Sequence, residues 1–207
     1  MCIRDRMFDG RIDESLARLH ELLTVSPFSA MHSMPLPSHL YVARRFDDAI
    51  AAAKAMQART PQFSMHWFLA KVYWEQGFFD KALDEERLEL ERRGDTVLLA
   101  ALEEGLDAAG PSGAMHAMAE ALVDRASESY VDPYDIGETF ARAGLIDEAL
   151  YWLDRAVEHR SYEITYLAFW PHLDVLRDEP RYQDQLERVY GNRVQDIRRA
   201  ANDLRSM

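Results

Sequence analysis

Three residues of one expected helix combine aromatic and cationic side chains on a single face. Trp67, Lys71 and Trp74 are four and three residues apart, and side chains at these spacings are neighbours on an α-helix. Tryptophan is enriched among the residues that dominate binding energy, and clustered exposed aromatic side chains mark interaction surfaces. The spacing therefore predicts a binding stripe, in which the two rings supply apolar contact and the ammonium group sets orientation.

Two other expected helices carry residues at the equivalent positions. These residues are Met34, Ser38 and Tyr41 in one helix, and Tyr134, Glu138 and Arg142 in the other. Aromatic side chains would anchor a partner, and charged side chains would select it. The candidate partner-binding residues are therefore Tyr41, Trp67, Lys71, Trp74, Tyr134, Glu138 and Arg142. The alternative is that these side chains pack on adjacent helices or on the C-terminal cover.

Residues that could bind a metal or perform catalysis are scattered. Seven histidines include no pair at the four-residue spacing of a helical zinc site; they are His20, His32, His39, His66, His116, His159 and His172. Cys2 is the only cysteine, so a disulfide within the chain and a cysteine-based zinc site are excluded. Neither a glycine-rich phosphate loop nor a nucleophile motif is present. We therefore expect no catalytic residue, no metal, no cofactor and no enzyme activity.

A highly charged run covers residues 84–93. Glu85 and Glu89 are four residues apart, and Glu89 is three or four residues before Arg92 and Arg93. These spacings are typical of charged neighbours on the water-facing side of a helix. We interpret the run as such a face, in preference to an acidic docking site.

The stripes must be positioned by helices that recur along the chain. Amphipathic runs begin at Ser15, Ala49, Ala82, Met115 and Ala149, which are 34, 33, 33 and 34 residues apart. A period of this length is typical of stacked helical hairpins, each of which buries its apolar face against its neighbours. The predicted fold is an all-α solenoid of elongated shape, and the first helix of each hairpin would line its concave groove.

Glycine, proline and aspartate mark where these helices begin and end. Gly77 and Gly144 each follow an amphipathic run, and glycine adopts the left-handed conformation of a helix C-cap without steric cost. Asp132 and Pro133 signal a helix start, because aspartate caps free amides and proline suits the first turn. Pro37 predicts a kink or a late start in the first full unit.

The period divides the chain into four segments. Residues 1–6 fit no part of the repeat and are interpreted as a non-native leader, and residues 7–27 as a partial N-terminal repeat. Residues 28–160 hold four repeats, of which the third keeps the period but lacks small packing residues; residues 110–113 would form the turn between its helices. Residues 161–207 are expected to form short helices that cap the last apolar face. We interpret the chain as a fragment whose first helix lacks its partner.

Composition limits the classes of partner. The chain has 207 residues, of which 48% are hydrophobic and 29% charged, and its net charge is −12. A negative surface repels a phosphate backbone, so direct nucleic-acid binding is not expected. No stretch is long and apolar enough for a membrane span, and no secretory signal is visible. A cytoplasmic location is the expectation.

The repeats resemble tetratricopeptide repeats. The resemblance rests on the period, on the alanines at 49, 82 and 149, and on the motifs Leu69-Ala70-x-x-Tyr73 and Ile136-Gly137-x-x-Phe140. A narrower likeness, in residues 40–50, Trp152-Leu153 and residues 173–182, is to the C-terminal repeat regions of bacterial signalling proteins. The resemblance implies a right-handed superhelix and a protein-binding role.

Two functions of different classes follow as expectations. The first is a protein-interaction or scaffolding module that binds a peptide or a partner domain in its concave groove. The alternative is a regulatory or sensor region of a larger bacterial transcriptional regulator or adenylate cyclase, whose effector domain would lie upstream. Self-association through the exposed N-terminal helix is a third possibility.

Overall fold

Every regular element of the protein is helical in the computed structural model, which describes residues 3–26 and 34–206. The all-α prediction is confirmed for these residues. The α-helices are α1 (Ile3–Phe8), α2 (Ile12–Val25), α4 (Pro35–Val42), α5 (Phe46–Arg59), α6 (His66–Glu75), α7 (Phe79–Arg93), α8 (Thr96–Glu128), α9 (Pro133–Ala143), α10 (Ile146–His159), α11 (Pro180–Tyr190) and α12 (Val194–Arg205). Three short 3₁₀ helices are η1 (Tyr162–Tyr166), η2 (Pro171–Leu176) and η3 (Gly191–Arg193).

One backbone turn recurs along the chain. Gly10, Arg44, Gly77 and Gly144 have φ angles of 76°, 59°, 75° and 82°. After each of them, the next amide donates a hydrogen bond of 2.8–3.0 Å to the carbonyl five residues before it, as in a Schellman cap. Arg44 adopts the left-handed conformation where the other units have glycine, and its guanidinium pairs with Asp174 at 2.7 Å. The turns reproduce the spacing seen in the sequence.

The third unit departs from this turn. Pro111 follows Gly110 and has no amide hydrogen, so it cannot donate the recurring bond. The chain instead breaks at Ala109 and Gly110 and resumes at Pro111 as the second half of α8. A Cβ atom on Gly105 would lie 2.3 Å from the carbonyl oxygen of Gly113. The break between the two helices is thus shorter than the predicted turn of residues 110–113. Gly105 and Gly113 provide the close packing between helices that we expected this unit to lack.

The predicted helix starts can be compared with the structure. Asp132 accepts a hydrogen bond of 2.9 Å from the amide of Tyr134, and Pro133 is the first residue of α9. Helix α4 begins at Pro35, which agrees with the late start predicted near Pro37. Residues 28–33 of the first full unit lie outside the described residues.

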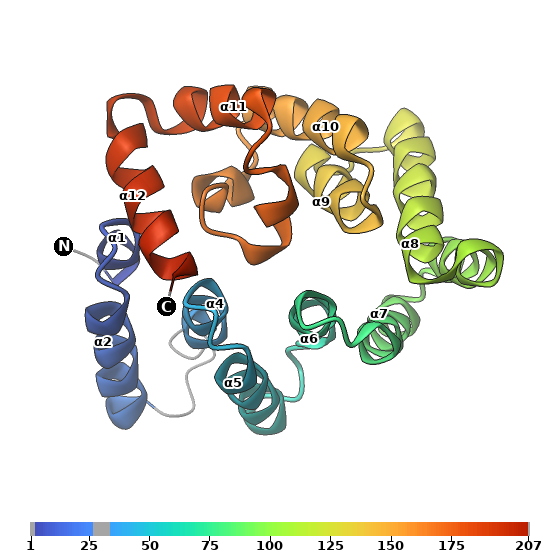
Figure 1. Cartoon of the computed structure of the whole chain (residues 1–207). Coiled ribbons are helices and arrows are strands. Elements are labelled where there is room, and N and C mark those ends of the chain that lie inside the picture. Colours follow the sequence, from blue (N-terminus) through green and yellow to red (C-terminus); the bar gives the residue numbers. More distant parts are fainter. Residues whose placement is uncertain (1–2, 27–33, 207) are drawn as a thin grey trace.

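The helices follow an arc that closes into a ring (Figure 1). Helices α11 and α12 continue the arc beyond α10, and α12 packs against α1. Arg193 pairs with Asp9 at 2.8 Å, and a Cβ on Gly10 would lie 3.3 Å from that of Ala200. The expected elongated shape is therefore wrong, because apolar residues of α12 and of α1 and α2 join in one core.

The segment before α11 lies inside the ring (Figure 1). We call residues 162–176, which include η1 and η2, the inner segment. Leu167 and Leu173 are fully buried, and η2 packs against α6, α9 and α10. Helix α11 covers the outer helix α10 as a cap would. The prediction that residues 161–207 all cap the end of the array is thus wrong for the inner segment, because ring closure offers its apolar side chains a more buried position.

The N-terminal helices are covered by the chain itself. Met7 is fully buried in α1, and Ser15 of α2 donates a hydrogen bond of 2.8 Å to the carbonyl of Ile3. Residues 3–6 are therefore part of a packed helix, which the interpretation as a leader did not foresee. Because α1 and α4 both pack against α2, helix α2 is not the unpartnered surface that self-association would need.

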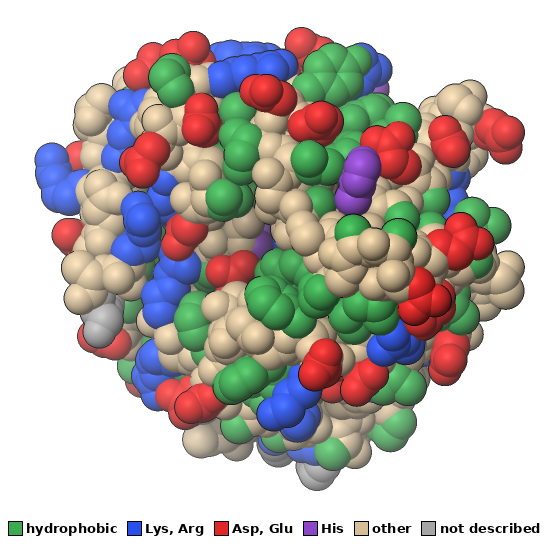
Figure 2. Space-filling view, turned by 45° about the vertical axis from the view of Figure 1, so that its right-hand side comes forward, with side chains coloured by type: hydrophobic (Ala, Val, Ile, Leu, Met, Phe, Trp, Pro, Cys, Tyr) green, Lys and Arg blue, Asp and Glu red, His purple; other side chains and the backbone are tan. Residues whose placement is uncertain are grey.

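Charge is distributed around the outside of the molecule. Figure 2 shows acidic and basic side chains interspersed over one face, with hydrophobic side chains between them. Within residues 3–26 and 34–206, no helix combines the length and the hydropathy that crossing a membrane requires.

Candidate functional site

The inward sides of α4, α6 and α9 carry the predicted stripes. Together with the inner segment, these helices enclose cavities that all seven candidate residues line: Tyr41, Trp67, Lys71, Trp74, Tyr134, Glu138 and Arg142. We call these three helix sides the inner surface. The structure therefore places residues of the three stripes around neighbouring cavities.

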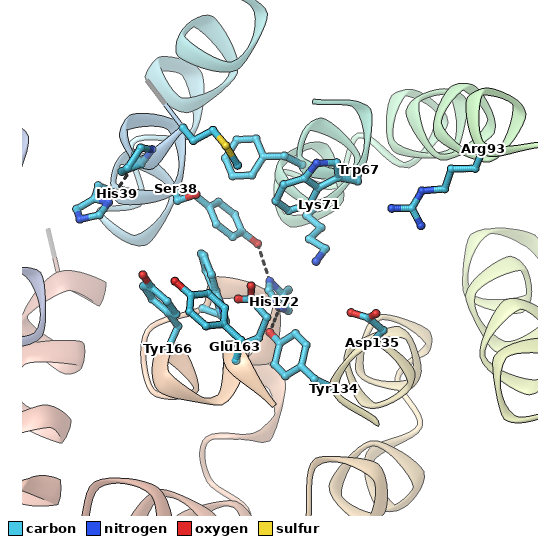
Figure 3. Close-up of a pocket in the computed structure, with 16 residues that line it drawn as sticks. Ser38, His39, Trp67, Lys71, Arg93, Tyr134, Asp135, Glu163, Tyr166 and His172 are labelled. Carbon is cyan, nitrogen blue, oxygen red and sulfur yellow. Dashed lines mark hydrogen bonds between the residues drawn. The ribbon is translucent and has the colours of Figure 1, made fainter. Parts of the chain in front are cut away.

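A buried histidine connects two of the stripes. His172, in the inner segment, is 5% exposed and lies between two tyrosines (Figure 3). Its Nδ1 is 3.2 Å from the hydroxyl of Tyr41, and its Nε2 is 2.9 Å from the hydroxyl of Tyr134. Nε2 also lies 3.1 Å from a carboxylate oxygen of Glu138. These contacts join α4, α9 and the inner segment in one polar layer.

An ion pair completes this layer. The ammonium group of Lys71 lies 2.7 and 2.8 Å from the two carboxylate oxygens of Glu138. Burial alone would raise the pKa of Glu138, but the charge of Lys71 and the hydrogen bond from His172 lower it to about 2. Burial lowers the pKa of His172, although Glu138 acts in the opposite direction. At neutral pH the layer therefore contains a charged Lys71–Glu138 pair and a neutral imidazole.

A cavity of about 380 Å³ opens above this layer, at the N-terminal ends of α4, α6 and α9. We call it the central cavity; its aromatic lining consists of Tyr41, Trp67, Phe68, Tyr134, Tyr162, Tyr166 and Trp170. The ammonium group of Lys71 is 5.3 Å from the centre of the Trp67 ring. Figure 3 shows Lys71 from α6 and Asp135 from α9 directed into the same space. The volume, and a lining that combines aromatic rings with a few polar groups, are typical of a small-ligand site.

A second cavity, of about 530 Å³, lies at the C-terminal ends of α6 and α9. Here the guanidinium of Arg142 stands 4.9 Å from the centre of the Trp74 ring and donates a hydrogen bond of 2.6 Å to Glu86. Its Nε and Nη2 atoms are buried without a hydrogen-bond partner among the described residues. Burial and repulsion from Asp174 raise the pKa of the nearby Glu75 to about 7. This end of the ring interior thus contains polar groups, and some of the buried polar atoms of Arg142 lack a hydrogen-bond partner among the described residues.

Exposure separates the candidate residues into two groups. Tyr41 and Tyr134 are 1% exposed, and Glu138 and Arg142 are also buried by the chain itself. Trp67, Lys71 and Trp74 are only partly buried. The packing alternative therefore describes the first group, whereas a partner could reach the second group without displacing any part of the protein.

The interpretation of residues 84–93 as a water-facing helix side is wrong for two carboxylates. Glu86 and Glu89 are buried, because α7 turns them toward α9 and the loop before α6. Glu89 binds Ser64, Arg92 and Arg93; burial alone would raise its pKa, but these hydrogen bonds lower it to about 2. Glu86 stands three residues after Leu83 and four before Leu90, so its place on the apolar stripe was a signal in the sequence.

His172 is the site residue that the sequence analysis missed as one of seven ordinary histidines. Its neighbours along the chain give no sign of its role, since its partners Tyr41, Tyr134 and Glu138 all lie far from it in the sequence. Among the described residues, no group of three His, Cys, Asp or Glu side chains is arranged to hold a metal ion.

No model of a known protein family matches the chain, and a search of curated proteins finds no match.

Proposed function

We propose that the protein is a tetratricopeptide-like binding module that takes a peptide segment of a partner protein at its inner surface. The recurring hairpin turn and the parallel placement of α4, α6 and α9 around one space support this assignment. The stripes of aromatic and charged side chains on these helices are chemically suited to anchoring and selecting a peptide. A cytoplasmic location, as in bacterial signalling proteins, is part of the proposal.

The observation that carries the proposal is the inner segment itself. It is an irregular polypeptide that already lies on the inner surface, held by aromatic packing and by hydrogen bonds that link His172 with Tyr41 and Tyr134. Trp170 stacks on His172 with a centroid distance of 5.8 Å. A surface that binds one such segment of its own chain has the pockets and polar groups that a partner segment would use.

The partner would enter at the part of the inner surface that remains accessible. Trp67 and Lys71 line the central cavity from α6, and Met34 and Tyr162 are exposed at its edge. Ser38 of α4 also faces this space (Figure 3). An inserted side chain would therefore meet aromatic rings on several sides and one buried ion pair at the base.

A second candidate function is regulatory sensing of a small ligand, as expected for the repeat region of a larger signalling protein. The inner segment favours it, because it converts what would be an open groove into a cavity of about 380 Å³. This volume lies in the range of small-molecule sites.

A peptide library displayed on phage tests the main proposal. Wild-type protein should enrich peptides whose binding is lost in a Trp67→Ala variant and retained in a Trp152→Ala variant, since Trp152 lies on the outer helix α10. Both tryptophans are partly buried, so thermal melting of the two variants checks that each remains folded. Peptides that bind Trp67→Ala as well as wild type, or a library without enriched peptides, would overturn the proposal.

A further inference from the structure

The central cavity has more carboxylates than cations to neutralise them. Lys71 is already committed to Glu138, while Asp135 and Glu163 also line the cavity. Within the described part of the chain, neither Asp135 nor Glu163 has an ion-pair partner within 4.0 Å. Arg93, the other Lys or Arg side chain among the described residues that line the cavity, bonds Glu89 at 2.7 Å. The cavity is thus left with unmatched negative charge.

The environment of these two carboxylates makes a cation favourable. Asp135 is accessible at the cavity mouth, yet the protein around it partly excludes water, and Glu138 repels it; together these effects raise its pKa to about 6. Burial also raises the pKa of Glu163, against the attraction of Lys71. A positive ligand between them would be attracted by both groups in a medium less polar than water.

The walls of the cavity specify what kind of cation fits. Trp67, Tyr166 and Trp170 line it, and Tyr166 stacks on Trp170 at 5.1 Å. Aromatic faces attract organic ammonium groups, which need less water around them than a metal ion does. Lys71 over Trp67 is an example within the protein itself.

We propose that the central cavity binds an organic ammonium group, held between the aromatic walls and the carboxylates of Asp135 and Glu163. This inference rests on the proposed function and deepens it, because it names the chemistry of the group that enters. The ammonium group belongs either to a free amine or to a lysine side chain, methylated or not, of a partner peptide. An anionic ligand is disfavoured, because both cations that line the cavity are already paired.

Calorimetric titration with choline tests the proposal. Choline should bind the wild-type protein, and 3,3-dimethylbutanol, which has the same shape without the charge, should bind at least roughly tenfold more weakly. A short peptide with a trimethylated lysine, compared with the same peptide carrying norleucine, distinguishes a side-chain source from a free amine. Tighter binding of choline than of the lysine peptide would indicate a small-molecule ligand, and the reverse a protein ligand; either supports the ammonium site.

Variants of the two carboxylates locate the site. Asp135→Asn and Glu163→Gln should each weaken choline binding roughly tenfold, whereas Asp107→Asn, on the exposed side of α8, should not. Binding should also weaken as the pH falls below about 6, where Asp135 gains a proton; Glu163, Glu138, Asp132 and Lys71 are the charged groups that act on it.

Two results would overturn the ammonium site. One is equal binding of choline and its uncharged analogue, or no binding of either. The other is unchanged choline binding in both carboxylate variants. If phage-selected peptides still require Trp67 but choline gives either of these two results, the peptide-binding proposal stands and the ammonium site alone fails.

Discussion

At the scale of single residues, His172 holds the inner segment in place. The imidazole is buried against Trp170 and makes contacts within 3.2 Å with Tyr41, Tyr134 and Glu138. The two tyrosine hydroxyls would otherwise be buried without a partner, which costs about 1–3 kcal/mol per group. We therefore expect His172 to contribute to the stability of the inner segment.

Replacement of His172 by phenylalanine tests this dependence. The ring fills a similar space but leaves two tyrosine hydroxyls without their partner, so the free energy of unfolding should fall by about 1–3 kcal/mol. Urea unfolding measures it, with His159→Phe, at an exposed position of α10, as the control. Unfolding midpoints that coincide for wild type and His172→Phe would contradict the account.

The sequence predicted part of this layer. Tyr41, Tyr134, Glu138 and Lys71 were identified because helical spacing alone places residues on a common face. His172 could not be found in this way, since its position depends on where a distant irregular segment docks. The same reason explains why the sequence left burial of Tyr41 and Tyr134 as an alternative to partner binding: the side chains that cover them come from the inner segment.

At the scale of elements, glycine determines how closely the two halves of α8 approach. The Cβ of an alanine at Gly105 would lie 2.3 Å from the carbonyl oxygen of Gly113, and one at Gly113 would lie 2.4 Å from that of Gly105. Asp95 caps the first half and pairs with Arg125 of the second at 2.7 Å. The two halves of α8 are therefore in contact near the break, at Gly105 and Gly113, and also far from it, between Asp95 and Arg125.

Substitution of Gly105 by alanine measures this close approach. In an open helix the change stabilises by about 0.5–1 kcal/mol, but here backbone must move, so we expect a loss of about 1–3 kcal/mol. Glu104→Ala, on the neighbouring exposed position, should change the unfolding free energy by less than about 0.5 kcal/mol. A Gly105→Ala variant as stable as wild type in thermal melting would show that the halves are not in contact.

Helix boundaries were largely predictable, because caps and breakers act locally. Asp132, Pro133 and Gly144 delimit α9 as their chemistry requires. The left-handed turn at Arg44 was not predicted, since arginine carries no such local preference; tertiary packing and the pair with Asp174 hold it there. Close packing in the third unit was assessed by the small residues that the other units carry. The close approach of the two halves of α8 at Gly105 was therefore not predicted.

At the scale of the whole molecule, ring closure turns an open surface into an interior. Helix α12 reaches α1, and the inner segment occupies the enclosed space (Figure 1). The repeat period does not predict this closure, because closure depends on the small rotation between successive hairpins and on a C-terminal segment outside the repeat. The buried polar layer and the central cavity both lie inside the ring that this closure forms.

Cross-linking across the closure tests this claim most directly. In a Cys2→Ser background, the pair Asp9→Cys and Arg193→Cys is treated with a short bis-maleimide at low protein concentration, with Asp9→Cys and Asp107→Cys as the control pair. Because the Asp9 and Arg193 side chains lie 2.8 Å apart, the first pair should form a cross-link within one molecule and the control pair should not. Cross-links only between molecules, or none at all, would contradict the closed ring.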